Sequence, residues 1–289
     1  MKKTTMLRKL LEREEILLVP GAYDAITAKV IQKTGFEAVY MSGSCTSSAL
    51  LGQADVGFLT MTEMVRNAQY MADAIDIPVI SDADTGYGNA INVMRTVREY
   101  ERAGVAGIHI EDQVSPKKCG HMKGIQLVSE DEMISKIKAA LEARDDPDFV
   151  VIARTDGGTL GINEAIERGR AYAKAGADMI FGEALKSVED FKLFAKSIDI
   201  PLMADSTEWG KSPLLTAKEL EDMGYNLVIF STAALRVHIR SVMDLMEEIM
   251  KTGTQRKFMD DRMVTRDYTY QLVGLPEIYK LEDKFAIKR

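Results

Sequence analysis

The stretch Ser81-Asp82-Ala83-Asp84-Thr85-Gly86-Tyr87-Gly88-Asn89 decides the fold that we predict. It follows the apolar run 75–80, which is short enough for a buried strand, and precedes residues 91–98, which have helical spacing. Asp82 and Asp84 therefore leave the carboxyl end of a strand, and the period-two alternation points them to the same side. Close like charges repel unless a cation or a shared proton lies between them. The pair suits Mg²⁺ or Mn²⁺, and the alternative is a solvated acidic turn.

The same strand-then-helix rhythm runs through the whole chain. Apolar runs predict strands at 16–20, 38–41, 75–80, 107–112, 149–154, 179–183, 201–205 and 227–231. Amphipathic segments predict helices at 25–33, 62–74, 90–103, 130–144, 162–175, 187–197, 216–223 and 233–251. Apolar strands that alternate with helices form parallel sheets, and eight of them favour a closed (β/α)8 TIM-type barrel. An open doubly wound sheet is the rival architecture.

The two ends of the chain add helices to this barrel. Residues 5–14 predict a charged amphipathic helix, and residues 45–57 predict a loop of small residues. The polar tail from about residue 252 carries an apolar stripe, which we expect to pack on its own barrel or on a neighbouring subunit: Leu272, Leu275, Ile278, Tyr279 and Leu281. The sequence has no linker rich in Pro, Gly or Ser, so we predict one domain over residues 1–289.

Composition excludes several classes of partner. The chain has 289 residues, is 46% hydrophobic and carries a net charge of −7, which argues against nucleic acid or an anionic membrane as a partner. It contains two cysteines, Cys45 and Cys119, too few for a disulfide framework, so a reducing cytoplasm is the expected location. The basic amino-terminal segment lacks the apolar core of a signal peptide, and no apolar run reaches membrane-spanning length.

A barrel places its active site at the carboxyl ends of the strands. The residues predicted there are Tyr40, Ser42, Gly43, Asp82, Asp84, Glu111, Arg154, Glu183 and Asp205, with Arg236 just beyond the last strand. We expect Asp82 to contact the metal directly, and Asp84, Glu111 and Asp55 to hold it directly or through water. Arg154 and the backbone N–H groups of Ser42 and Gly43 would hold a substrate carboxylate. The alternative for these charges is a solvated rim with surface ion pairs.

A second informative stretch is the loop 113–124, which is long, basic and rich enough in glycine to serve as a mobile lid. Cys119 lies beside Lys117, Lys118 and His121 in this loop. Positive neighbours lower a thiol pKa, so the sequence predicts a thiolate or a proton-donating thiol. An incidental loop cysteine or half of a metal site are the alternatives, whereas Cys45 is predicted to be structural.

With these residues assembled, the chain resembles the isocitrate lyase/phosphoenolpyruvate mutase superfamily. The resemblance is carried by Asp82-Ala83-Asp84-Thr85-Gly86-Tyr87-Gly88-Asn89, His109-Ile110-Glu111-Asp112-Gln113, Lys117-Lys118-Cys119-Gly120-His121 and Ala153-Arg154-Thr155-Asp156. It implies a Mg²⁺-dependent barrel enzyme acting on a small α-oxo or α-hydroxy carboxylate. It also implies a homotetramer in which the last barrel helix is exchanged between subunits.

Within that superfamily, the Lys-Lys-Cys-Gly-His loop resembles the carbon–carbon lyases. The resemblance implies a retro-aldol cleavage in which Cys119 protonates the product carbanion. Methylisocitrate lyases carry Arg and Lys after this loop motif and Asn in place of Asp205, whereas this chain has Met122 and a carboxylate. The lost positive charge favours a dicarboxylate such as 2,3-dimethylmalate over the tricarboxylate 2-methylisocitrate.

Three other functions stay open at this stage. Residues 43–47, 224–227 and 253–258 resemble carboxyvinyl-carboxyphosphonate phosphorylmutase, while Arg236 favours the lyase. An oxaloacetate hydrolase or decarboxylase and a non-catalytic scaffold are weaker alternatives. The predicted catalytic residues are Cys119, His121, Tyr40 and Arg154. The predicted substrate-binding residues are Ser42, Gly43, Ser44, Asp82, Gly120, His121, Arg154, Glu183, Asp205, Thr207 and Arg236.

Overall fold

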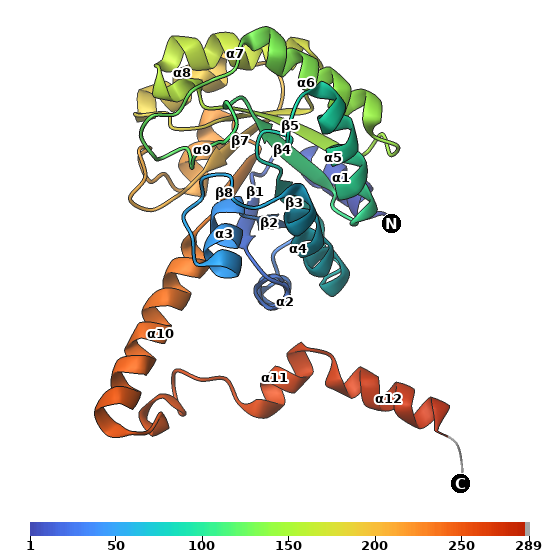
Figure 1. Cartoon of the computed structure of the whole chain (residues 1–289), viewed down its shortest axis with the longest axis vertical. Coiled ribbons are helices and arrows are strands. Elements are labelled where there is room, and N and C mark those ends of the chain that lie inside the picture. Colours follow the sequence, from blue (N-terminus) through green and yellow to red (C-terminus); the bar gives the residue numbers. More distant parts are fainter. Residues whose placement is uncertain (287–289) are drawn as a thin grey trace. The chain divides into compact units, whose positions relative to one another are not determined.

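In the computed structural model, which describes residues 1–286, eight parallel strands form a closed barrel in chain order, and β1 pairs with β8 (Figure 1). This confirms the predicted (β/α)8 barrel. The strands are β1 Leu17–Ala22, β2 Val39–Met41, β3 Val79–Asp82, β4 Gly107–Glu111, β5 Val150–Thr155, β6 Met179–Gly182, β7 Leu202–Asp205 and β8 Leu227–Phe230. The predicted third strand began too early, because helix α4 ends at Ala74 and the strand starts only after Pro78.

Helices surround the barrel in Figure 1. They are α1 Lys3–Leu11, α2 Ala25–Thr34, α3 Gly43–Leu51, α4 Met61–Ala74, α5 Ala90–Arg102, α6 Glu130–Ala143, α7 Ile162–Lys174, α8 Val188–Ser197 and α9 Ala217–Met223. The helix α10 Ala233–Thr252 follows β8. The prediction of a loop at residues 45–57 was wrong in its first half, which belongs to α3. The Ser42 side chain caps this helix by accepting the N–H of Cys45, and Gly52 ends it in the left-handed conformation.

Two apolar layers build the barrel. Inward-facing residues fill its interior, for example Val19 of β1, Ile80 of β3 and Ile152 of β5. Their sequence neighbours point outward and pack under the helices in a second cluster. Successive side chains of a strand point to opposite faces, so residues two apart share a face. The face of each residue that follows along a strand can therefore be counted from these inward-facing positions.

Helix α1 closes the amino-terminal end of the barrel. Leu7 and Leu10 are buried in the same cluster as the inward-facing strand residues. The Arg8 guanidinium supports the helix through an ion pair with Asp178 at 2.8 Å. Because this end is filled with apolar side chains, polar groups of the barrel interior gather at the opposite, carboxyl end.

The chain divides into two compact units after Ala234. The second unit begins at Leu235 in α10 and continues through the turn Arg256–Phe258, α11 Arg266–Leu272 and α12 Leu275–Phe285. None of the described residues of α11 and α12 is buried. The prediction of a single domain remains a prediction. No helix among residues 1–286 is both long and apolar enough to cross a membrane.

Candidate active site

The polar residues at the carboxyl end continue the inward face of the strands. Ile80 is followed two residues later by Asp82, and Ile152 by Arg154, so each polar side chain enters the barrel above an apolar one. The same two-residue spacing along the other strands places four more polar residues on the inward face: Ser42, Glu111, Glu183 and Asp205. All but Asp205, which is half-buried, are buried.

An acidic cluster forms at the ends of β3 and β4. The Lys117 ammonium lies 2.7 Å from Asp55 Oδ1 and 2.8 Å from Asp84 Oδ1. Asp82 Oδ1 accepts the backbone N–H of Asp84 at 2.9 Å. Both carboxylate oxygens of Glu111 are buried and accept no hydrogen bond from residues 1–286. Asp55, Asp82 and Asp84 therefore lie together around a lysine that the sequence analysis did not assign to the site, and Glu111 ends the neighbouring strand.

The pKa values of this cluster depend on burial and on Lys117. Burial raises the pKa of Asp84 to about 6, although Lys117 opposes the shift, and burial raises the pKa of Glu111 well above its ordinary value. Burial also acts against ionisation of Asp82, but His109, Lys117 and Arg154 lower its pKa to about 2. The cluster thus has more carboxyl groups than nearby positive charge, and the oxygens of Glu111, which accept no hydrogen bond from residues 1–286, suit a hard divalent cation.

The amino end of α3 approaches this cluster closely. A Cβ on Gly43 would lie 2.4 Å from Asp82 Oδ2, so only glycine allows the backbone to come this near. Ser44 follows in the first turn of the same helix. Backbone N–H groups at a helix amino terminus favour anions. This geometry agrees with the predicted carboxylate-binding role of residues 42–44, which remains a prediction.

The Nε–Nη2 edge of the Arg154 guanidinium is already occupied by a protein carboxylate. Its Nε and Nη2 donate to Asp156 Oδ2 and Oδ1, both at 3.0 Å. Glu111 Oε2 lies 3.4 Å from Nε, and Glu183 Oε2 lies 3.5 Å from Nη2. The bidentate partner of this arginine is therefore a residue of the same loop, which the sequence analysis did not single out.

The predicted lid lies over the acidic cluster. The backbone N–H of Cys119 donates to the carbonyl of Asp55 at 3.1 Å. A Cβ on Gly120 would meet Arg154 Nη2 at 2.6 Å, so the lid packs directly on the guanidinium. The predicted lowering of the Cys119 pKa was wrong: burial raises it to about 11, because Lys117 is paired with the carboxylates. The thiol is protonated at neutral pH.

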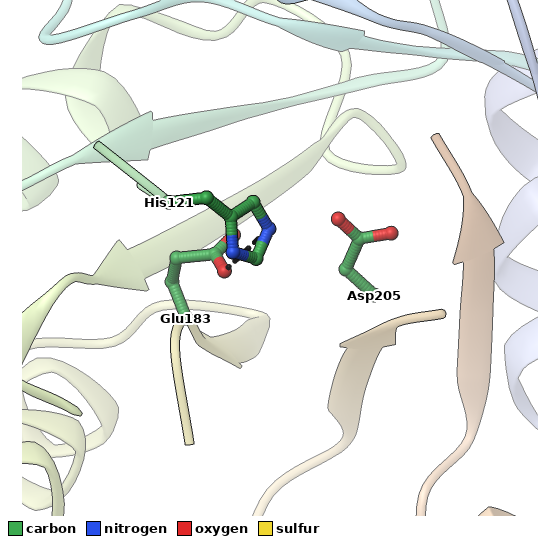
Figure 2. A group of neighbouring side chains, drawn as sticks. All are labelled: His121, Glu183 and Asp205. Carbon is green, nitrogen blue, oxygen red and sulfur yellow. Dashed lines mark ion pairs between the residues drawn. The ribbon is translucent and has the colours of Figure 1, made fainter. Parts of the chain in front are cut away.

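His121, Glu183 and Asp205 form a second polar group beside the lid. Their ligand atoms lie within 4.8 Å of one another, and His121 Nε2 is 3.6 Å from Glu183 Oε1 (Figure 2). The backbone N–H of Lys211 donates to His121 Nδ1 at 3.1 Å, which leaves the hydrogen of a neutral ring on Nε2. Ser231 Oγ donates to both oxygens of Asp205 at 2.9 Å. Burial, followed by the charge of Glu183, raises the pKa of Asp205 to about 8.

Tyr40 lies at the bottom of the site. Its hydroxyl is 2.9 Å from His109 Nε2, and the two rings stack with centroids 5.7 Å apart. Burial lowers the pKa of His109 to about 4 and raises that of Tyr40 well above 10. The hydrogen bond therefore joins a neutral imidazole to a phenol that is not ionised at neutral pH.

Two predicted residues lie outside these groups. Thr207 is buried, and its hydroxyl is 3.0 Å from that of Thr232 in the loop after β8. Arg236 belongs to the second compact unit, so its predicted contact with the substrate stays a prediction. Ser231 was missed, although counting by two from Ile229 would have placed it on the inward face.

Comparison with known proteins identifies close relatives. The family described as phosphoenolpyruvate phosphomutase matches residues 7–250. The chain is 49% identical to 2,3-dimethylmalate lyase of Eubacterium barkeri over 100% of both chains. It is 43% identical to 2-methylisocitrate lyase of Aeropyrum pernix over 98% of this chain and 91% of the relative. It is 39% identical to the chloroplastic carboxyvinyl-carboxyphosphonate phosphorylmutase of Arabidopsis thaliana, over 98% of this chain and 84% of the relative.

Solved structures give the same result. A crystal structure of 2,3-dimethylmalate lyase, described as a PEP mutase/isocitrate lyase superfamily member, superposes with a TM-score of 0.93 at 38% identity, covering 99% of this chain and 96% of that one. Phosphonopyruvate hydrolase in complex with oxalate and Mg²⁺ superposes with a TM-score of 0.90 at 31% identity, covering 99% of this chain and 100% of that one.

Proposed function

The chain belongs to the phosphoenolpyruvate mutase/isocitrate lyase superfamily, and from this premise we propose that it is a Mg²⁺-dependent carbon–carbon lyase that cleaves a 2-hydroxy dicarboxylate. The substrate class is that of 2,3-dimethylmalate, and the products are pyruvate and a short monocarboxylate such as propionate. The relative with 49% identity is named for this reaction, and relatives with 42–43% identity are named as 2-methylisocitrate lyases.

One observation carries the proposal: a half-buried, protonated cysteine thiol on a lid that is anchored to the acidic cluster. Cys119 is tied to Asp55 through its backbone, and its raised pKa keeps the proton on sulfur at neutral pH. A retro-aldol cleavage generates a carbanion that must be protonated, and a thiol on a closing lid is suited to donate that proton.

We assign the metal to Asp82, with Asp84, Glu111 and Asp55 as the other ligands. The oxygens of Glu111, which accept no hydrogen bond from residues 1–286, and the raised pKa of Asp84 support this choice. A bound Mg²⁺ would supply Lewis-acid stabilisation of negative charge on the substrate oxygens, and Mn²⁺ would suit the same oxygen ligands. His121, Glu183 and Asp205 also converge, but we assign them to the substrate because the backbone N–H of Lys211 occupies His121 Nδ1 and the Ser231 hydroxyl occupies Asp205.

The protein residues then act as follows. The amino end of α3 at Ser42–Ser44 and the guanidinium of Arg154 hold the carboxylate next to the substrate hydroxyl. A carboxylate of the acidic cluster takes the hydroxyl proton, the C2–C3 bond breaks, and its electron pair remains on C3. The Cys119 thiol gives its proton to C3. The raised pKa of Tyr40 keeps its phenol protonated, so we do not assign it as this base.

Asp205 supports discrimination against tricarboxylates at alkaline pH, where its carboxyl group is ionised. Its carboxyl group faces Glu183 and His121, in a pocket that already carries negative charge. An ionised Asp205 repels a third substrate carboxylate, whereas the neutral acid resembles the asparagine of the methylisocitrate lyases. We therefore propose that discrimination against tricarboxylates is strongest above pH 8.

We also propose a cytoplasmic homotetramer in which each chain is one functional domain. The exposed apolar side chains of α10, among them Val237, Met246 and Met250, support association with another copy of the chain, including exchange of this helix. Size-exclusion chromatography with light scattering tests this assembly.

The alternative function is carboxyvinyl-carboxyphosphonate phosphorylmutase, which forms a P–C bond. The 39% identity to the Arabidopsis enzyme favours it less than the 49% identity to the dimethylmalate lyase. An oxaloacetate hydrolase would share the metal and the fold but would need an attacking water.

The testing experiment is a pyruvate assay coupled to lactate dehydrogenase, with Mg²⁺ and either 2,3-dimethylmalate, 2-methylisocitrate or isocitrate. We expect the best turnover with 2,3-dimethylmalate. Cys119→Ser should lower kcat by about 10²-fold or more with little effect on KM, because a missing general acid acts on the chemical step. Turnover of a tricarboxylate alone would contradict the assigned substrate, and silence with all three compounds would contradict the lyase.

A further inference from the structure

Behind the candidate active site lies a buried carboxylate that the proposed reaction does not use. Asp112 follows Glu111, and the alternation of side chains turns it away from the barrel interior toward α7. It is fully buried. Its Oδ1 accepts the backbone N–H of Asp156 at 2.9 Å. Its Oδ2 accepts the hydroxyls of Thr155 and Tyr172, both at 2.8 Å.

A cation completes the surroundings of Asp112. Arg168 Nη1 lies 3.2 Å from Asp112 Oδ2 and also donates to the carbonyl of Val128 at 3.0 Å. The Nε of the same guanidinium is held by Glu164 at 2.7 Å. Four donors thus converge on one carboxylate, and two of them belong to the segment that leaves β5. Asp112 thereby fixes the start of that segment to the end of β4.

The segment held in this way carries the partner of Arg154. Asp156 is fully buried, and its two oxygens occupy Nε and Nη2 of the arginine. A bidentate pair of this kind fixes the plane of the guanidinium as well as its position. The other two carboxylates near Arg154, those of Glu111 and Glu183, are 3.4 and 3.5 Å away. Three carboxylates surround Arg154, and the bidentate pair with Asp156 is the contact that fixes the orientation of the guanidinium.

The loop has little freedom to deliver Asp156 differently. A Cβ on Gly158 would lie 2.3 Å from the carbonyl oxygen of Glu183, so this loop packs against the end of β6. Thr155 Oγ1 also accepts the N–H of Gly157 at 3.0 Å. The arrangement is a connected set of hydrogen bonds that runs from α7 through Asp112 and Asp156 to the guanidinium.

We infer that Asp112 and Asp156 are positioning residues that hold Arg154 for binding the substrate carboxylate. Asp156 takes the Nε–Nη2 edge, so the guanidinium turns its remaining Nη1 edge toward the anion. Glu111 and Glu183 are thereby kept from capturing the arginine. This inference rests on the proposed carboxylate substrate, but it concerns binding and not the reaction that follows.

The test uses oxalate binding, measured by calorimetry in saturating Mg²⁺, so that it does not depend on turnover. Asp156→Asn keeps the shape of the side chain and removes its charge. We expect the Kd of oxalate to rise about tenfold, because a hydrogen bond to a charged group is lost. The KM of the substrate should rise by a similar factor while kcat stays within about threefold, since the contact exists before and during the reaction.

A double-mutant cycle separates positioning from a general structural effect. Arg154→Lys cannot form the bidentate pair, so adding Asp156→Asn to it should change the Kd of oxalate by less than about twofold. Additive effects would overturn the inference. The matched control is Glu167→Gln, which removes a charge from the exposed face of the same helix α7 and should leave oxalate binding unchanged within about twofold.

Tyr172→Phe provides a milder variant if Asp156→Asn does not fold. It removes one of the four donors to Asp112 and keeps every charge, and we expect a two- to fourfold weaker binding of oxalate. Unchanged binding in the folded variants, as judged by circular dichroism, refutes the positioning role. If the wild-type protein binds oxalate but cleaves no tested substrate, the proposed reaction fails while the positioning role is still decided by the variants.

Discussion

Substrate selectivity should depend on pH through a single carboxyl group. Burial and the neighbouring Glu183 raise the pKa of Asp205 to about 8. A carboxyl with this pKa is about 10% ionised at pH 7 and about 90% ionised at pH 9. If a tricarboxylate is accepted only while Asp205 is neutral, its kcat/KM relative to that of the dicarboxylate falls about ninefold over this range, which is about 1.3 kcal/mol.

The assay is the coupled measurement of pyruvate at pH 7, 8 and 9 with saturating Mg²⁺, for 2,3-dimethylmalate and 2-methylisocitrate in parallel. Taking the ratio of the two substrates removes the effect of pH on steps that they share. Asp205→Asn replaces the titrating acid by a permanently neutral group of the same size. Its ratio should be constant with pH and should equal that of the wild-type protein near pH 7.

A second variant tests the sign of the effect. The Ser231 hydroxyl donates to both oxygens of Asp205 and so favours the ionised form. Ser231→Ala should raise the pKa of Asp205 and move the fall in tricarboxylate turnover to higher pH. The reasoning is refuted if the wild-type ratio does not change between pH 7 and 9, or if Asp205→Asn shows the same pH dependence as the wild type.

Two further predictions concern the lid and the metal. Gly120→Ala places a Cβ 2.6 Å from Arg154 Nη2, so the lid cannot close fully, and kcat should fall about 10²-fold with little change in the thermal midpoint; a wild-type kcat would contradict this. Asp82→Asn should weaken Mg²⁺ binding, measured by calorimetry, by about tenfold or more, and unchanged affinity would remove Asp82 from the ligand set.

The fold could be predicted from the sequence because the strand–helix rhythm is strong and regular. The error at residues 45–57 has a local cause. Thr46, Ser47 and Ser48 are weak helix formers. They are also polar, so this segment lacks the apolar periodicity by which a helix is predicted. The information was nevertheless present in Ser42, whose side chain caps α3, and in Gly52, which ends it.

The pKa of the Cys119 thiol could not be predicted from the charges of its neighbours in the sequence. Lys117 and Lys118 are neighbours of Cys119 in the chain, but their charges serve other groups. Lys117 is buried between Asp55 and Asp84, and Lys118 donates to the carbonyls of Lys123 and Gly124. Burial of the sulfur then decides its pKa. Pairings of this kind depend on where the lid packs, which the order of residues does not reveal.

The charge balance of the site explains why so many of its carboxyl groups resist ionisation. Seven acidic side chains lie at this end of the barrel: Asp55, Asp82, Asp84, Glu111, Asp156, Glu183 and Asp205. Two permanent cations face them, Lys117 with Asp55 and Asp84, and Arg154 with Asp156. Lys117 and Arg154 leave the site short of positive charge, and burial raises the pKa values of Asp84, Glu111 and Asp205, whereas His109, Lys117 and Arg154 lower that of Asp82. An anionic substrate entering such surroundings would be repelled unless a further cation entered with it. The divalent metal that we propose for this site would balance the excess of carboxyl groups, and Lys117, which belongs to the lid, contributes to the same balance.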